Sequence, residues 1–189
     1  MDKLKIVAIV GSLRRESYNR QLALAAKEML EGKADFEILE YQDIPFMNQD
    51  IEFPAPDSIK RVRAQVKSAD GVWFFTPEYN HFFPGVLKNL IDWLSRQISE
   101  TEPQVLAGKP AALSGITIGM SGTGLAQDHL VTLISLLTMD VMNAPRLTIP
   151  NAMGMHNKEG KFELGASRPY LEKQVDAFLE FIRSRRKAL

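Results

Sequence analysis

The sequence contains no cysteine among its 189 residues. This absence excludes disulfide bonds, thiolate catalysis and zinc–thiolate sites. The chain also lacks an excess of charge of either sign, because 23 lysine and arginine residues balance 23 aspartate and glutamate residues. A net charge of zero does not favour nucleic acid or an anionic membrane surface as a partner. The three histidines are scattered without ligand spacing, so no metal site is expected.

Long hydrophobic runs are missing as well. The apolar stretches fall well short of the roughly 18 residues that a membrane-spanning helix needs. The first residues do not have the pattern of a signal peptide. We therefore expect a cytoplasmic protein with no membrane partner. With 45% apolar and 24% charged residues, the chain has the composition of one globular domain spanning residues 1–189.

Strand-like and helix-like segments alternate along the chain. Short apolar runs that predict strands are separated by segments in which apolar residues recur with helical spacing. This alternation favours right-handed crossovers and a parallel sheet with helices on both faces. The expected strands span residues 4–10, 36–39, 71–76, 111–116 and 147–149. The expected helices span residues 20–30, 57–68, 84–94 and 125–137, with a last helix through residues 171–182. Asp57 is expected to cap the second of these helices, and Pro84 to be the first residue of the third.

This α/β arrangement indicates where a ligand should bind. In an open parallel sheet, ligands lie outside the carboxyl ends of the strands, at the point where the strand order reverses. In the order 2-1-3-4-5 this point falls between the first and third strands. The loops after these two strands are therefore the leading candidates for a binding site, and the loop after the fourth strand is their neighbour.

The loop after the first expected strand has the parts of a phosphate cradle. A helix N-terminus offers free N–H groups and partial positive charge, and arginine adds a full charge. Neither standard glycine-rich phosphate motif is present, so side chains must hold the anion, which favours a terminal phosphate monoester. The alternative is an ordinary turn with a Ser or Asn helix cap. The polar and small residues of this loop are Gly11, Ser12, Arg14, Ser17 and Asn19.

The other two loops differ in character. Residues 76–85 contain two prolines that stiffen the loop, together with a tyrosine and two phenylalanines. A planar polar heterocycle could lie against this surface, or the aromatic side chains could pack in the core or a subunit contact. Residues 116–124 are rich in glycine, which allows close approach of the backbone to a ligand but also suits a simple flexible turn.

Three separated motifs occur in order along the chain: GSLRRESYN at residues 11–19, TPEYN at residues 76–80 and PGVLKNLIDW at residues 84–93. Together they resemble the NAD(P)H-dependent FMN reductase family. This is the flavodoxin-like group that includes bacterial quinone and chromate reductases and some azoreductases. Residues 108–110 and 122–130 follow the same pattern, so the resemblance covers nearly the whole chain. It implies an α/β flavodoxin-like three-layer sandwich, with a five-stranded parallel sheet, forming a single FMN-binding domain.

The resemblance also implies a role for each loop. The first loop, which follows Gly11, would hold the FMN phosphate, and the other two would surround the isoalloxazine ring. Relatives often carry more serine, or Ser-Pro-Gly, where this chain has residues 116–119. The implied phosphate ligands are Ser12, Arg14, Ser17 and Asn19, and the implied ring contacts are Pro77, Glu78, Tyr79, Asn80, Thr117, Ile118 and Gly119.

We therefore expect an oxidoreductase with FMN as cofactor, NAD(P)H as co-substrate and small-molecule electron acceptors. Hydride would pass from the nicotinamide to the flavin, and then by ping-pong exchange to quinones, free flavin, azo compounds or metal oxyanions such as chromate. The flavin carries this chemistry, so no catalytic side chain is expected. The resemblance further implies a homodimer or homotetramer.

Two other functions fit part of these observations. A flavodoxin-type electron carrier would bind FMN and serve protein partners. Such carriers typically present a strongly acidic face, which the zero net charge and the arginine in the first loop do not favour. The third interpretation is a flavin-free α/β scaffold that binds a nucleotide or a sugar phosphate.

Overall fold

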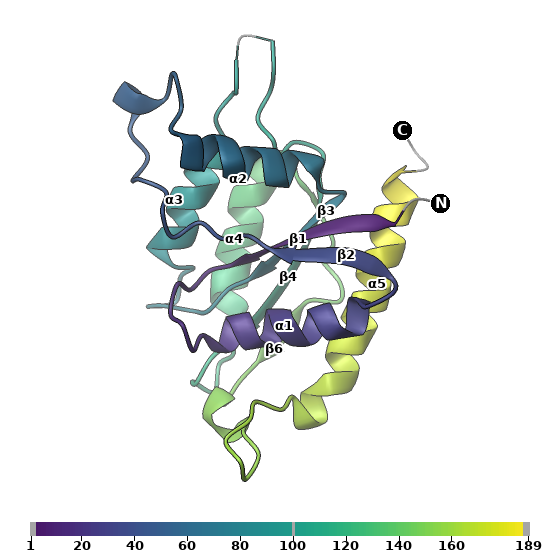
Figure 1. Cartoon of the computed structure of the whole chain (residues 1–189). Helices are drawn as coiled ribbons and strands as arrows, with labels where there is room; N and C mark the ends of the chain where they lie inside the picture. The colour runs from purple at the N-terminus through teal and green to yellow at the C-terminus, as the bar shows by residue number, and fades with distance from the viewer. Residues whose placement is uncertain (1–2, 100, 187–189) are drawn as a thin grey trace.

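A parallel β-sheet runs through the middle of the molecule, with helices on both sides (Figure 1). The computed structural model describes residues 3–99 and 101–186. The strands occur in the order β2-β1-β3-β4-β5, and β6 also pairs with β4. The expected order and three-layer architecture are therefore confirmed. The strands are β1 (Leu4–Val10), β2 (Ala34–Ile38), β3 (Gly71–Phe75), β4 (Pro110–Ile116), β5 (Asp140–Val141) and β6 (Leu147–Ile149).

Within the described residues, five α-helices cover the two faces of the sheet. One face carries α1 (Tyr18–Leu30) and α5 (Arg168–Arg186) (Figure 1). The other carries α2 (Asp57–Ser68), α3 (Gly85–Leu94) and α4 (Gly124–Leu136). None of the helices in these ranges is long and apolar enough to cross a membrane.

Each layer of helices encloses its own hydrophobic cluster. Side chains alternate between the two faces along a strand, so a strand covered on both sides is apolar throughout. In β3, Trp73 and Phe75 pack with Phe178 of α5, whereas Val72 and Phe74 pack under the other layer. Every residue of β3 and β4 is buried. These two strands form the rigid centre from which the loops at the carboxyl edge emerge.

Three local expectations are corrected by the structure. The sheet has six strands rather than five, because β5, a two-residue strand, pairs with the start of β4. A strand this short has no periodic signal in the sequence. The N-cap of α2 is Pro56, and Asp57 is its first helical residue rather than its cap. Likewise Pro84 is the N-cap of α3, which begins at Gly85.

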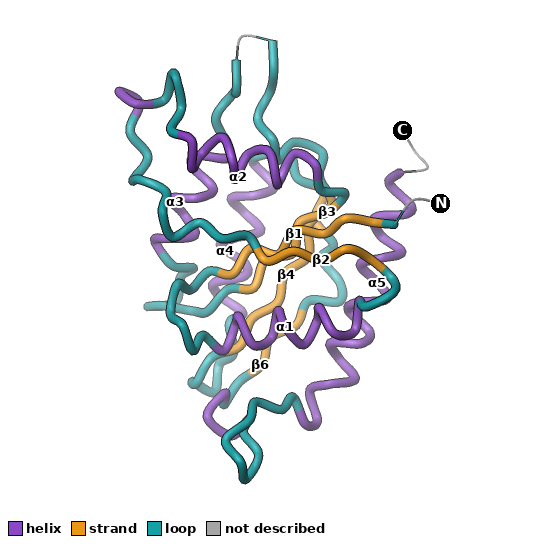
Figure 2. The backbone as a smooth tube through the Cα atoms, viewed as in Figure 1, coloured by secondary structure: helices purple, strands orange, loops and turns teal. Residues whose placement is uncertain are grey.

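The carboxyl ends of β1, β3 and β4 lie side by side. Val10 is paired with Phe75, and Phe75 with Ser114. The ladder continues into the loops, since Gly11 N donates to Phe75 O at 2.8 Å and Thr76 N to Ser114 O at 2.9 Å. The loops that follow these strands therefore begin at the same edge, where Figure 2 shows several loops gathered at the left of the sheet.

Candidate functional site

A pocket of about 350 Å³ lies at this edge, where the loops after β1, β3 and β4 meet. We call it the edge pocket. Most of the site residues predicted from the sequence line it. The loop expected to hold the phosphate and the two loops expected to surround the ring therefore share one cavity. Gly11, Glu78, Asn80 and Gly119 belong to the same loops but do not line it. Its walls are Ser12, Arg14, Ser17, Tyr18, Asn19, Pro77, Tyr79, Ile116, Thr117, Ile118 and Met153.

One end of the edge pocket has the hydrogen-bond donors and the positive charge that suit an anion. Ser17 is the N-cap of α1, and its Oγ accepts a hydrogen bond from Arg20 N at 3.3 Å. The first turn of α1 therefore directs free N–H groups and partial positive charge toward this end. The exposed guanidinium of Arg14 lies 5.2 Å from the ring centroid of Tyr18. No carboxylate neutralises Arg14 among residues 3–99 and 101–186, so its charge is available to a phosphate.

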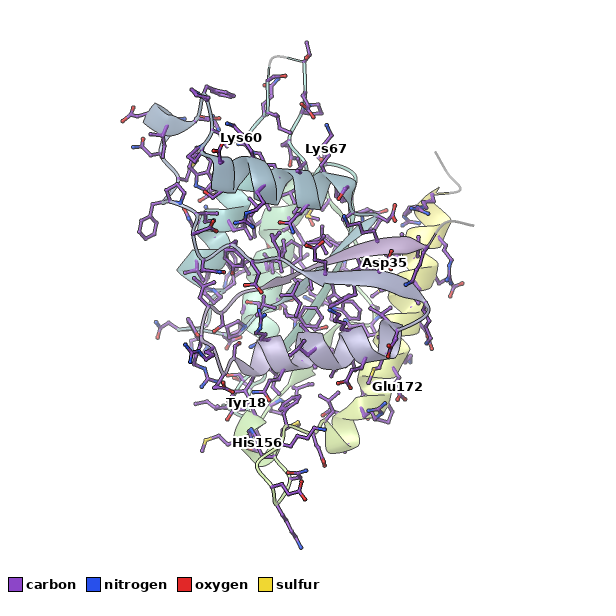
Figure 3. The ribbon with its side chains drawn as sticks, in the orientation of Figure 1. Tyr18, Asp35, Lys60, Lys67, His156 and Glu172 are labelled. Carbon is purple, nitrogen blue, oxygen red and sulfur yellow. The ribbon has the colours of Figure 1, made fainter. Side chains whose placement is uncertain are left out.

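Tyr18 also lines the edge pocket and is not among the site residues predicted from the sequence. Figure 3 shows it at the start of α1, with His156 beside it. The two ring centroids are 5.6 Å apart and the planes meet at 65°. His156 comes from the segment after β6, which also supplies Met153 to the pocket. An aromatic residue next to the phosphate loop was a usable signal for Tyr18, whereas nothing in the polar 150–166 segment indicated that it reaches the site.

Asn19 lines the pocket, but its polar atoms are used elsewhere. Its Nδ2 donates to Ile116 O at 2.9 Å, and its Oδ1 accepts from Ile116 N at 3.1 Å. The side chain is buried and joins the start of α1 to the end of β4. Asn19 therefore fixes the distance between the phosphate loop and the β4 loop, and its amide is already paired within the protein.

The loop after β3 presents Tyr79 to the pocket through a tight turn. Tyr79 N donates to Phe82 O at 2.8 Å, and Phe82 N donates to Tyr79 O at 3.0 Å. The two residues between them, Asn80 and His81, have positive φ values of 52° and 63°. This geometry matches a two-residue hairpin turn, which favours Asn at such positions. The turn leaves Tyr79 52% exposed at the mouth of the pocket.

Glu78 points away from the pocket and caps a helix. Its Oε2 accepts a hydrogen bond from Ala126 N at 3.0 Å, in the first turn of α4. Thr123, the N-cap of α4, makes no capping bond with its own side chain. The carboxylate also suits the positive end of the helix dipole. Glu78 thus connects the loop after β3 to α4, so its structural role is to hold Tyr79 in place.

The loop after β4 contributes apolar surface on a fixed backbone. Thr117 N donates to Ile149 O at 3.0 Å, and Thr117 O accepts from Ala152 N at 2.9 Å. The side chains of Ile118 and Met153 are 61% and 70% exposed. These two hydrogen bonds fix the backbone of the β4 loop against β6 and the segment after it. Ile118 from the β4 loop and Met153 from the segment after β6 therefore lie with Tyr79 in the edge pocket, where they suit one face of a flat ring.

Several residues outside the edge pocket have structural roles. The apolar stripe of α4 lies in the core, because Leu130 and Ile134 are buried and Leu133 packs against the same cluster. His129 stacks on Phe82 at 4.4 Å between ring centroids. Within the described ranges, no group of three His, Asp or Glu side chains is placed to hold a metal ion.

The strand order and the helices on both faces define a flavodoxin-like fold. The edge pocket combines a positively charged end with an apolar end, and this chemistry suits FMN. Comparison with known families identifies the family within this fold. The chain belongs to the NADPH-dependent FMN reductase family, whose model matches residues 4–154.

Relatives match over nearly the whole chain. A 2-hydroxy-1,4-benzoquinone reductase from Burkholderia sp is 36% identical over 183 residues, covering 97% of this chain and 98% of the relative. A quinone reductase from Escherichia coli (strain K12) is 34% identical over 189 residues and covers 96% of both chains. The solved structure of FerB, a flavoenzyme NAD(P)H:(acceptor) oxidoreductase from Paracoccus denitrificans, has 33% identity and a TM-score of 0.86, with 96% and 99% coverage.

These findings confirm the expected class of protein. The chain is an oxidoreductase of the flavodoxin-like fold, with FMN as its cofactor and NAD(P)H as its co-substrate. The residues of the edge pocket fit that cofactor, since a free guanidinium and a helix N-terminus suit a phosphate and the exposed apolar side chains suit a ring.

Proposed function

We propose that the protein is an FMN-dependent NAD(P)H:quinone oxidoreductase that works by ping-pong exchange. The observation that carries the proposal is the edge pocket, which joins an anion-binding end to an apolar end that is open to solvent. The two curated relatives described above are named as quinone reductases, which supports quinones as acceptors. FMN supplies the hydride and electron transfer when bound.

The chain's own residues have three tasks in this reaction. Arg14 and the first turn of α1 bind the phosphate, with Ser12 and Ser17 beside them. Tyr79, Ile118 and Met153 orient the ring and leave one side accessible. The nicotinamide and the acceptor use this side in turn. Because the side is open to solvent, water supplies the proton that accompanies the hydride in quinone reduction, and no proton-transfer side chain is required. Because an open mouth selects weakly by shape, free flavin, azo compounds and chromate are proposed as further acceptors.

We also propose that residues 1–189 form one domain that assembles as a homodimer or homotetramer. Outside the lining of the edge pocket, Phe82, Met120 and Leu125 are also exposed, and exposed apolar surface of this kind often marks an interface. Burying them against a second copy would remove this surface from water. A cytoplasmic location stays a prediction.

The proposed function is tested on the purified protein loaded with FMN. We expect the yellow flavin to be bleached by NADPH or NADH without oxygen, and the colour to return when a benzoquinone is added. Initial rates against both substrates should give parallel double-reciprocal lines. A bound flavin that neither nicotinamide reduces would indicate an electron carrier instead. A protein that stays colourless after FMN is added would contradict both functions.

Replacing Arg14 with alanine should weaken FMN binding by at least about tenfold. A charge-assisted hydrogen bond to phosphate is worth about 1.5–3 kcal/mol. Riboflavin lacks the phosphate, so its affinity should change little. Titrating the apoprotein with each flavin and following flavin fluorescence measures both affinities. Arg183→Ala is the matched control, because Arg183 is an exposed arginine near the end of α5. Equal losses for FMN and riboflavin would show that Arg14 does not contact the phosphate.

A further inference from the structure

A second cavity, of about 480 Å³, lies on the other side of the loop that follows β1. We call it the basic hollow. It opens between the carboxyl ends of β1 and β2 and the start of α1, and Ser12 and Arg14 line both it and the edge pocket. The two cavities are therefore neighbours that share one wall. The basic hollow is lined by Val10, Ser12, Leu13, Arg14, Arg15, Arg20, Leu39, Glu40, Tyr41 and Gln42.

The basic hollow carries more positive than negative charge. Three arginines line it, and Glu40 is its single acidic residue. Arg20 Nη2 donates to Glu40 Oε1 at 2.8 Å, which neutralises one guanidinium. Arg14 and Arg15 have no carboxylate partner within residues 3–99 and 101–186. Two guanidinium charges are thus left for an anion.

The remaining polar groups do not compete for that anion. The Tyr41 hydroxyl donates to Val10 O at 2.6 Å. Burial, and secondarily the charge of Glu40, raises the pKa of Tyr41, so this side chain adds no negative charge. Glu40 stays paired with Arg20, whose guanidinium has further N–H donors that the single bond to Glu40 does not use. An incoming anion therefore meets Arg15 together with the free edge of Arg20.

We propose that the basic hollow binds the 2′-phosphate of NADPH, with Arg15 and Arg20 as residues that determine nicotinamide specificity. The inference rests on the proposed function, because it requires the nicotinamide to lie at the open face of the edge pocket. The adenosine end of the dinucleotide then extends away from that face. The adjoining basic hollow is a site where its additional phosphate meets unneutralised charge.

The chemistry of the lining favours a phosphate monoester. FMN takes Arg14 in the shared wall, so Arg15 remains for a second anion. A phosphate dianion accepts several charge-assisted hydrogen bonds, and arginine's planar set of donors suits it better than lysine. NADH lacks the 2′-phosphate and gains nothing from these contacts. The hollow should therefore favour NADPH over NADH.

Steady-state kinetics of the FMN-loaded protein with a saturating benzoquinone test the assignment. The ratio of kcat/KM for NADPH to that for NADH should fall at least about tenfold in Arg15→Glu, because the phosphate then meets a like charge. Arg20→Gln removes the second cation and should lower the ratio in the same direction. The control is Arg183→Glu, the same charge reversal on the exposed surface of α5, which should leave the ratio unchanged.

Nucleotide binding gives a readout that does not depend on turnover. Calorimetric titration of the FMN-loaded protein should show 2′,5′-ADP binding at least about tenfold more tightly than 5′-AMP. Arg15→Glu should abolish this difference. Equal affinities for the two nucleotides, together with a kinetic ratio that neither variant changes, would overturn the assignment while NAD(P)H oxidation stands. A protein that oxidises neither nicotinamide would overturn the proposed function and this inference with it.

Discussion

Replacing Gly115 with alanine is expected to lower the free energy of unfolding by about 3 kcal/mol or more and to abolish FMN binding. Gly115 lies near the end of β4, next to Ile116, which lines the edge pocket. A Cβ here would overlap Thr123 Oγ1 and the backbone oxygen of Thr76, and would lie 2.8 Å from Thr123 Cβ. Overpacking a core costs about 1–3 kcal/mol, and a clash with backbone cannot be relieved by a rotamer change.

The loss of binding follows from which segments must move. Thr76 begins the loop that carries Tyr79, and Thr123 precedes α4, whose first turn holds Glu78. Guanidinium denaturation and FMN titration measure the two effects. The matched control is Gly124→Ala, because a Cβ at Gly124 meets no atom within 4 Å. That variant should stay within about 0.5 kcal/mol of the parent protein. A Gly115→Ala protein of near-parental stability would show that these three segments are not closely packed.

The sheet and its helices were predictable from the sequence because their signals are local. Strands buried on both faces must be apolar throughout, and helices that cover a sheet must show helical spacing of apolar residues. Residues 71–75 and 85–94 satisfy these conditions, and the structure has β3 and α3 there. The two-residue β5 was missed, since it is held by pairing with β4 and not by its own pattern.

The position of the site was predictable for a topological reason. Parallel strands end at a common edge, so the loops after β1, β3 and β4 could be assigned to one edge of the sheet from the strand order. The family resemblance supplied the individual residues, such as Arg14 and Ile118, which the structure places in one pocket. The roles of single side chains were harder to predict. A carboxylate in the loop after β3 can face a ligand or a helix N-terminus, and the sequence does not distinguish these two orientations. In the structure Glu78 faces α4.

Asn19, at the end of the loop after β1, is a second side chain whose role the sequence does not reveal. From the sequence its amide is a donor near an anion, and the structure shows that both of its polar atoms are bound to Ile116. The contact joins residues 97 positions apart, so no local pattern can reveal it. Met153 is similar, because it reaches the edge pocket through the path of the chain after β6.

Replacing Asn19 with alanine is expected to cost about 2–5 kcal/mol of stability and to weaken FMN binding more than tenfold. The variant leaves Ile116 N and O buried without their partner, and each unsatisfied buried group costs about 1–3 kcal/mol. It also frees the start of α1 from the end of β4, so the phosphate and ring ends of the edge pocket lose their fixed separation. Misplacing binding groups lowers affinity because the ligand must then order them.

Asn89 in α3 offers a matched control for this effect. Its Oδ1 accepts from Met47 N at 2.7 Å and its Nδ2 donates to Pro45 O at 2.9 Å. It is thus another asparagine that holds backbone with both polar atoms, but it does not line the edge pocket. Asn89→Ala should lower the free energy of unfolding and leave FMN affinity close to that of the parent protein. If both variants weaken FMN binding equally, the loss reflects general loosening, and Asn19 has no special part in positioning the two ends of the site.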